Sequence, residues 1–149
     1  MNHNRYYAKW LPALGLHALH QVEESISFFQ WYLDHETDIP RWLLIVSGEH
    51  AAMLVRRPEL FVAATVAQLL AVSALAFAFR RNERSTKFLL VFYLLGLVCF
   101  LAWHVMTSYA VHSYPPVMVT CVGGLFLIPR WLYEIFVLSK ESHRRSEAT

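Results

Sequence analysis

Charged residues are scarce in this chain of 149 residues, where aspartate, glutamate, lysine and arginine together make up 16%. Soluble domains carry about 25% of such residues, so the shortage argues against a soluble globular fold. The net charge is only +2, which leaves no strongly basic surface, and we expect no nucleic-acid partner. Cysteine is also rare: Cys99 and Cys121 lie in apolar runs without a Cys-x-x-Cys pair. This excludes the disulfide framework of small secreted domains, although a bond between these two cysteines stays open.

Several familiar signatures are missing as well. The sequence has no glycine-rich phosphate loop, no Gly-x-Ser-x-Gly turn and no cysteine-based nucleophile pattern, so the enzyme classes built on them are not indicated. The first apolar stretch is not uninterrupted, because it contains His17, His20, Glu23 and Glu24. We therefore expect no cleaved signal peptide.

Apolar residues, in contrast, are abundant, at 56% of the chain with a mean hydropathy of +0.36. About 20 apolar residues are enough for a helix to cross a bilayer. We predict an all-α membrane protein in which one domain, residues 1–149, forms a bundle of about four transmembrane helices. The predicted spans cover residues 10–33, 60–79, 88–113 and 117–138.

Two local features modify this arrangement. Residues 41–55, between the first two spans, are predicted to form a short amphipathic helix that lies on the membrane surface. The last span follows the stiff turn Tyr114-Pro115-Pro116 and contains Gly123-Gly124 and Pro129. We expect a kink or a break in this span, because proline removes a helical hydrogen bond.

Lysine and arginine are distributed unequally over the two sides of a four-span topology. The side with fewer holds Arg41, Arg56 and Arg57. The other side, which carries both termini, holds Arg5, Lys9, Arg80, Arg81, Arg84, Lys87, Lys140, Arg144 and Arg145. Positive residues favour the cytoplasmic side. We therefore predict a multi-pass protein of the cell membrane with both termini in the cytoplasm.

The first predicted span carries four ionisable residues on one side. Successive residues of an α-helix turn by about 100°, which places His17, His20 and Glu24 within an arc of about 60°. Glu23 widens this arc to about 120°. An ionisable group within a membrane is costly and normally faces the interior of the bundle and a partner. These four residues are therefore the first candidates for a functional site.

The third span supplies the partner. His104 lies in its apolar part, and His112 lies further along, nearer the outer edge. Spans one and three run parallel in the predicted topology. The depth of their residues in the bilayer can therefore be compared by multiplying residue number along each span by the helical rise. Glu24 lies about 20 Å and His104 about 24 Å above the point where each span enters. We expect them to meet in the half of the bilayer away from the cytoplasm.

Imidazoles and carboxylates are the ligands that zinc, non-haem iron and manganese prefer. The candidate metal ligands are His20, Glu24, His104, His17 and His112. A bound divalent metal would neutralise the buried carboxylates and so lower the cost of burial. The same residues could also work without a metal, with Glu23 and Glu24 as catalytic acid and base.

A structural interpretation stands beside the functional one. A lone histidine such as His17 is ordinarily a core residue with one hydrogen bond, and His50 in the outer loop is ordinarily solvated, although it could cap the site. The whole group could form a structural polar network with Arg130 of the last span as counter-ion. Because ionisable groups within membranes usually serve function, we favour a functional site.

The pentapeptide His20-Gln21-Val22-Glu23-Glu24 resembles the motif that names the HXXEE family of small bacterial integral membrane proteins. That family pairs this motif with a later membrane histidine and a Tyr-x-Pro-Gly-type turn into the last helix. The counterparts here are His104 and Tyr114-Pro115-Pro116, followed by Val119-Thr120, without the glycine of the turn. The resemblance implies a polytopic membrane protein with enzymatic activity that a metal could support. It favours His20, Glu23, Glu24 and His104 as site residues.

The combined hypothesis is a membrane-embedded, metal-dependent enzyme that acts on a lipid-soluble substrate between spans one and three. Zinc would suggest a hydrolase, and a redox metal would suggest an oxidoreductase that hydroxylates or desaturates. The first alternative is a metal-free acid–base isomerase of the sterol-isomerase type. The second is a transporter or sensor that binds an ion or small molecule, for which a homodimer would provide the necessary size.

Overall fold

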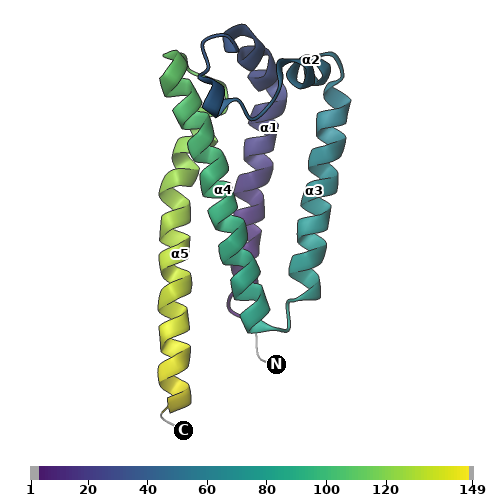
Figure 1. Cartoon of the computed structure of the whole chain (residues 1–149). Coiled ribbons are helices and arrows are strands. Elements are labelled where there is room, and N and C mark those ends of the chain that lie inside the picture. The colour runs from purple at the N-terminus through teal and green to yellow at the C-terminus, as the bar shows by residue number, and fades with distance from the viewer. Residues whose placement is uncertain (1–3, 148–149) are drawn as a thin grey trace.

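The fold is all-α, as predicted (Figure 1). The computed structural model describes residues 4–147, with side chains described as far as Lys140, so Arg144 and Arg145 of the orientation prediction lie outside the described side chains. The described residues form five α-helices and no strand. The helices are α1 (Trp10–His35), α2 (Gly48–Arg56), α3 (Pro58–Ala78), α4 (Glu83–Val111) and α5 (Met118–Glu147).

Three of these helices are long and apolar enough to cross a membrane, which indicates a membrane protein. They are α3, α4 and the Met118–Lys140 part of α5, and their most apolar stretches have mean hydropathies of 2.2, 2.3 and 1.6. Of the four predicted spans, three are therefore apolar enough to be recognised as membrane helices. The helix that falls short is α1, which has the length to span, at 26 residues, but carries histidine, glutamine and glutamate within its middle turns.

The four long helices lie side by side, and α2 lies across one end of the bundle (Figure 1). In this view α1 and α4 run in the same direction, and α3 and α5 run in the opposite one. The first turn of α1 and the last turns of α5 consequently lie at the same end. The parallel course of α1 and α4 allows residues halfway along one helix to meet residues further along the other.

The amphipathic segment is shorter than the predicted helix over residues 41–55. It consists of a 3-10 turn at Arg41–Leu43, an extended stretch, and α2, which begins only at Gly48. The start of α2 is fixed by Ser47, whose hydroxyl oxygen accepts a hydrogen bond from the backbone N–H of His50 at 3.2 Å. Such a cap satisfies a donor that the first helical turn leaves free. The helix is amphipathic, because it buries Ala51 and Leu54 against the bundle.

The core lies where α4 meets α5 and α1. Leu90, Leu94, Leu97 and Leu101 of α4 are all buried and follow a helical spacing of four, three and four residues. One close approach depends on glycine: a Cβ atom at Gly124 of α5 would lie 2.4 Å from a methyl carbon of Leu101. The small residue lets the two backbones approach closely, as is common where helices pack within membranes.

The last helix does not break where the sequence suggested that it would. α5 is assigned as one helix from Met118 to Glu147 with Pro129 inside it. Membrane helices tolerate an internal proline when neighbouring groups satisfy the freed carbonyl. Beyond Pro129, Arg130 forms an ion pair with Glu134, at 3.2 Å, rather than with the glutamates of α1. Lys9 from the chain before α1 also pairs with Glu134.

Candidate metal centre

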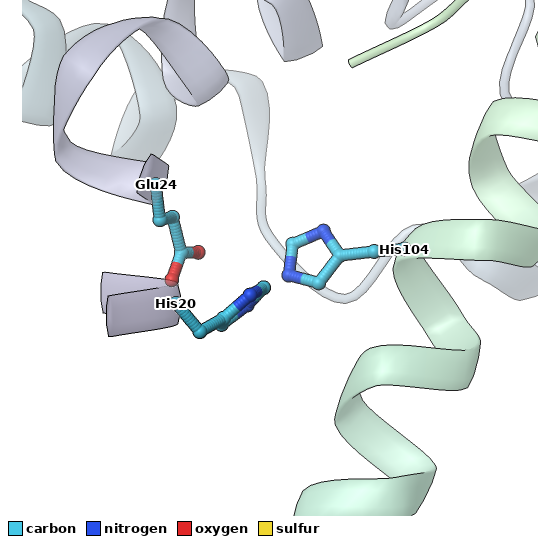
Figure 2. Close-up of side chains that lie close together, drawn as sticks. All are labelled: His20, Glu24 and His104. Atoms are coloured by element: carbon cyan, nitrogen blue, oxygen red, sulfur yellow. The ribbon is translucent and has the colours of Figure 1, made fainter. Parts of the chain in front are cut away.

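Three ionisable side chains from two helices converge inside the bundle. His20 and Glu24 lie one turn apart on α1, and His104 reaches them from α4 (Figure 2). One potential ligand atom from each residue lies within 4.8 Å of the other two. All three side chains are buried: the exposed fraction is 0% for both histidines and 5% for Glu24. Within the described residues, this set of donors has the composition and spacing of a metal centre.

Three of the four histidine ring nitrogens of this cluster lack partners. The Nε2 atom of His20 and both ring nitrogens of His104 are buried without a hydrogen bond. A buried polar group without a partner costs about 1–3 kcal/mol. A cation bound between the two rings and the Glu24 carboxylate would satisfy a nitrogen of each ring and neutralise the carboxylate. The donor set therefore fits a divalent metal.

Aromatic rings surround His104. Its ring centroid lies 4.5 Å from that of Phe28, 4.8 Å from Phe100 and 4.7 Å from Trp103. The His20 ring lies 4.9 Å away. These rings exclude other polar partners and hold the imidazole in one place. Exclusion of water also strengthens electrostatic interactions within such a site.

The Glu24 carboxylate is oriented by hydrogen bonds that reach α3. Its Oε2 atom accepts a hydrogen bond from Nε2 of Gln21 at 2.9 Å. The amide oxygen of Gln21 in turn accepts one from the hydroxyl of Thr65 at 2.8 Å. Supporting hydrogen bonds of this kind fix the direction of a metal-binding carboxylate.

The second glutamate of the motif points elsewhere. The Glu23 carboxylate accepts hydrogen bonds from the Thr120 hydroxyl at 2.6 Å and from the Thr120 backbone N–H at 3.2 Å. The same hydroxyl lies 2.8 Å from Nδ1 of His20. Glu23 is thus outside the three-residue cluster and contacts it through Thr120 of α5.

An apolar cavity of about 730 Å³ adjoins the cluster. Residues of α1, α2, α3 and α4 line it, and α3 packs against α1 and α2 rather than against α4. Of the three cluster residues only Glu24 belongs to the cavity wall. The polar lining residues are His17, Gln21, Glu24, His50 and Gln68, and the remainder are apolar or aromatic. The cavity has the size and character of a site for an apolar small molecule.

The other predicted site residues lie outside the cluster. His17 faces the cavity, where its Nδ1 atom lies 2.5 Å from the hydroxyl of Tyr93. His112 ends α4 with a left-handed backbone, at a φ of 51°. His50 is exposed on α2 and lines the cavity. Cys99 and Cys121 are both free thiols, so no disulfide joins them.

The residues that sequence reasoning missed are the hydrogen-bond partners. Thr120 and Thr65 are ordinary polar residues within apolar spans, and nothing in their spacing connects them to the cluster. Gln21 could have been noticed because it precedes Glu24 by one helical turn. Thr120 had a signal only through the family resemblance, in which Val119-Thr120 follows the Tyr-Pro-Pro turn.

Comparison with known proteins places these residues in a family. A family model described as "Protein of unknown function with HXXEE motif" matches residues 10–133. The chain belongs to the HXXEE family. The matched region contains the whole cluster, the pentapeptide of α1 and the turn before α5. No curated protein and no solved structure matches the chain. The HXXEE family carries no assigned reaction, so the function has to be argued from the site.

Proposed function

We propose that the protein is a membrane-embedded metalloenzyme in which His20, Glu24 and His104 hold one divalent metal beside a cavity for a lipid-soluble substrate. One observation carries the proposal: three buried donor groups from α1 and α4 converge within 4.8 Å. Three histidine nitrogens among them have no other partner. An apolar core gains nothing from such an arrangement unless something binds to it.

Three protein ligands leave a metal with a free coordination position, as is typical of catalytic rather than structural sites. A metal held there would supply Lewis-acid chemistry if it is zinc, which suggests hydrolysis, or redox chemistry if it is iron or manganese. The residues of the chain supply the rest. His20 and His104 orient the site, the aromatic rings around His104 exclude water, and Glu24 presents its carboxylate to the cavity.

The substrate class follows from the cavity walls. Leu54, Val72 and Phe100 are typical of the lining, and such walls favour an apolar molecule over a sugar, nucleotide or peptide. Glu24 and the His17–Tyr93 pair provide the polar contacts. A membrane-dissolved substrate would enter between α3 and α4, where these helices do not pack closely.

The same structure supports a fourth membrane span. α1 exposes Leu19, Val22 and Ile26, at 61%, 59% and 72% of their surface, and buries His17, His20, Gln21 and Glu24. Its outward face is therefore apolar and its inward face polar, an arrangement that suits a helix in lipid. The polar inward face lowers the mean hydropathy of α1. We include in the proposal that α1, α3, α4 and α5 all span the membrane, with both ends in the cytoplasm.

Cysteine accessibility tests this topology. Ala8→Cys and Trp42→Cys are each made in a Cys99→Ala/Cys121→Ala background. They introduce thiols at exposed positions beyond the two ends of α1, one before its first residue and one after its last. We expect a membrane-impermeant maleimide applied to intact cells to label the cysteine at position 42 and to leave the one at position 8 unlabelled until the membrane is permeabilised. Labelling at both positions in intact cells would show that α1 does not cross the membrane.

Elemental analysis tests the metal site. We expect full-length protein, purified in detergent without chelators, to contain about one zinc, iron or manganese ion per chain. The metal should be lost from a His20→Ala/Glu24→Ala variant and strongly reduced in Glu24→Gln. Glu49→Gln, at an exposed position on α2, is the matched control and should keep its metal.

The opposite result is equally informative. Wild-type protein that contains no metal, and takes up none after incubation with each ion, contradicts the metalloenzyme. The cavity position of Glu24 and of the His17–Tyr93 pair would then favour the alternative, acid–base isomerisation of an apolar substrate.

A further inference from the structure

A continuous chain of hydrogen-bonding groups links two helices, α1 and α5, at the edge of the cluster. It runs from the Glu23 carboxylate of α1 through the Thr120 hydroxyl of α5 to Nδ1 of His20, again on α1, with separations of 2.6 Å and 2.8 Å. His20 has one other contact at this nitrogen, the sulfur of Cys121 at 3.9 Å, which is a weak partner. The other ring nitrogen of His20, Nε2, has no partner within the protein.

The number of available protons fixes the direction of this chain. A threonine hydroxyl has a single proton to donate, and an ionised carboxylate can only accept. If Thr120 donated its proton to His20, its oxygen would face the Glu23 oxygen at 2.6 Å with no proton between them. A hydrogen bond to a charged acceptor is also stronger than one to a neutral nitrogen or to the backbone oxygen of Val117, which lies further from the hydroxyl, at 3.3 Å. Thr120 therefore donates to Glu23, and Nδ1 of His20 must carry a proton and donate to Thr120.

We propose that Thr120, held by Glu23, is a positioning residue that fixes His20 as the Nδ1–H tautomer and so leaves the Nε2 lone pair free to bind a ligand beside His104 and Glu24. A neutral imidazole carries one proton, so protonation at Nδ1 leaves Nε2 as the acceptor. Metal-bound histidines commonly have their second nitrogen held in this way, through a carboxylate, a carbonyl or a water. Here a hydroxyl intervenes between the imidazole and the carboxylate.

The start of α5 explains why Glu23 can perform this role. Thr120 is the third residue of α5, and the first backbone N–H groups of a helix have no partner within it. Glu23 accepts the N–H of Thr120 at 3.2 Å, so its carboxylate lies at the positive end of the helix dipole. That contact holds the carboxylate beside the hydroxyl. The two glutamates of the motif thus have different roles: Glu24 faces the ligand, and Glu23 positions His20.

This role of Thr120 rests on the proposed function, because it serves the metal site. The tautomer of His20 can nevertheless be measured without any metal. Magic-angle-spinning nitrogen NMR of histidine-labelled, chelator-treated protein in lipid bilayers separates protonated from unprotonated ring nitrogens. The His20 signals are identified by their loss in His20→Asn. We expect a protonated Nδ1 and an unprotonated Nε2 in the wild type and in Thr120→Ser. Thr120→Val should show a signal for protonated Nε2.

Metal binding provides the second readout. We expect Thr120→Val, which keeps the shape of the side chain, to weaken metal affinity about 10- to 100-fold, the usual effect of losing such a partner. Thr120→Ser, which keeps the hydroxyl, should restore most of the affinity. Thr107→Val is the matched control, because Thr107 lies one helical turn from His104, is fully buried, and donates its hydroxyl to the backbone oxygen of Trp103 rather than to a cluster residue.

The outcomes separate the two proposals. A wild-type His20 protonated at Nε2, or a tautomer that is unchanged in Thr120→Val, overturns the positioning role whether or not metal binds. Wild-type metal affinity in Thr120→Val overturns it as well and leaves the metal site standing. Protein that binds no metal but shows the Nδ1–H tautomer, lost in Thr120→Val, contradicts the metalloenzyme and supports the positioning of His20 towards another ligand.

Discussion

Replacing His104 with leucine is expected to stabilise the metal-free protein and, at the same time, to abolish its stabilisation by added metal. The first effect arises because both ring nitrogens of His104 are buried without a partner, at about 1–3 kcal/mol for each such group. Leucine has no polar atoms and fits among the aromatic rings around this position. The second effect arises because the variant lacks one of three ligands. The same substitution should therefore move stability in opposite directions under the two conditions.

Thermal unfolding in detergent, followed with chelator and then with added zinc, iron or manganese, measures both effects. Metal at 100 times its dissociation constant stabilises a folded protein by about 2.7 kcal/mol, and we expect this gain in the wild type but not in His104→Leu. His17→Leu is a useful comparison. It removes the partner of the Tyr93 hydroxyl, so it should destabilise the metal-free protein while leaving the response to metal in place.

Two results would argue against this account of His104. A leucine variant that is less stable than the wild type in chelator would mean that the imidazole is already satisfied in a structural network. A variant that still gains stability from metal would place the metal elsewhere in the protein.

Filling the cavity from Gly96 is expected to prevent an apolar ligand from binding without disturbing the His–Glu cluster. Gly96 lies on the cavity wall, and a Cβ atom there would meet nothing within 4 Å. Gly96→Phe therefore places a ring in open space rather than against the protein. Phenylalanine also favours the helix more than glycine does, so α4 should remain intact.

A fatty acid that carries a photoreactive diazirine is a suitable probe. In wild-type protein we expect its crosslinks, mapped by mass spectrometry, to fall on cavity residues of α1, α3 and α4. In Gly96→Phe they should drop to background, with metal content unchanged. Gly123→Phe is the matched control, because Gly123 of α5 also has open space around it but does not line the cavity. Equal crosslinking of the cavity residues in all three proteins would show that the probe binds elsewhere.

The sequence predicted the helical content and the two halves of the cluster, and the reasons are local. Apolar runs identify α3, α4 and α5, and the helical repeat places His20 and Glu24 on one face of α1. Their meeting with His104 followed from a parallel course of two spans and a comparison of depth. Each of these inferences needs only the geometry of an α-helix and the number of times that the chain crosses the membrane.

The sequence could not show which neighbouring helix each helix face contacts. The contact between Glu23 and Thr120 joins residues 97 positions apart, and the helical repeat of α1 does not specify which helix lies opposite Glu23. His17 lies on the same arc as His20, yet its Nδ1 atom contacts the hydroxyl of Tyr93, because His17 is about one turn nearer the start of α1 and so lies level with an earlier part of α4 than His104. Helix packing and the widths of gaps depend on all side chains together, so they cannot be derived from one segment at a time.

The loose packing of α3 separates access to the site from the integrity of the site. Of its 21 residues only Ala76 is buried, and the helix is attached at its ends through Arg57 and the turn before Asn82. The His–Glu cluster is built from α1 and α4 and supported by α5. The contribution of α3 is the Thr65 hydroxyl, which bonds Gln21 and not a cluster residue. Outward displacement of α3 therefore leaves the ligands assembled. For the proposed enzyme, the rate of substrate entry by such a displacement would depend on the thickness and fluidity of the surrounding bilayer, so the lipid would influence the reaction rate as well as dissolve the substrate.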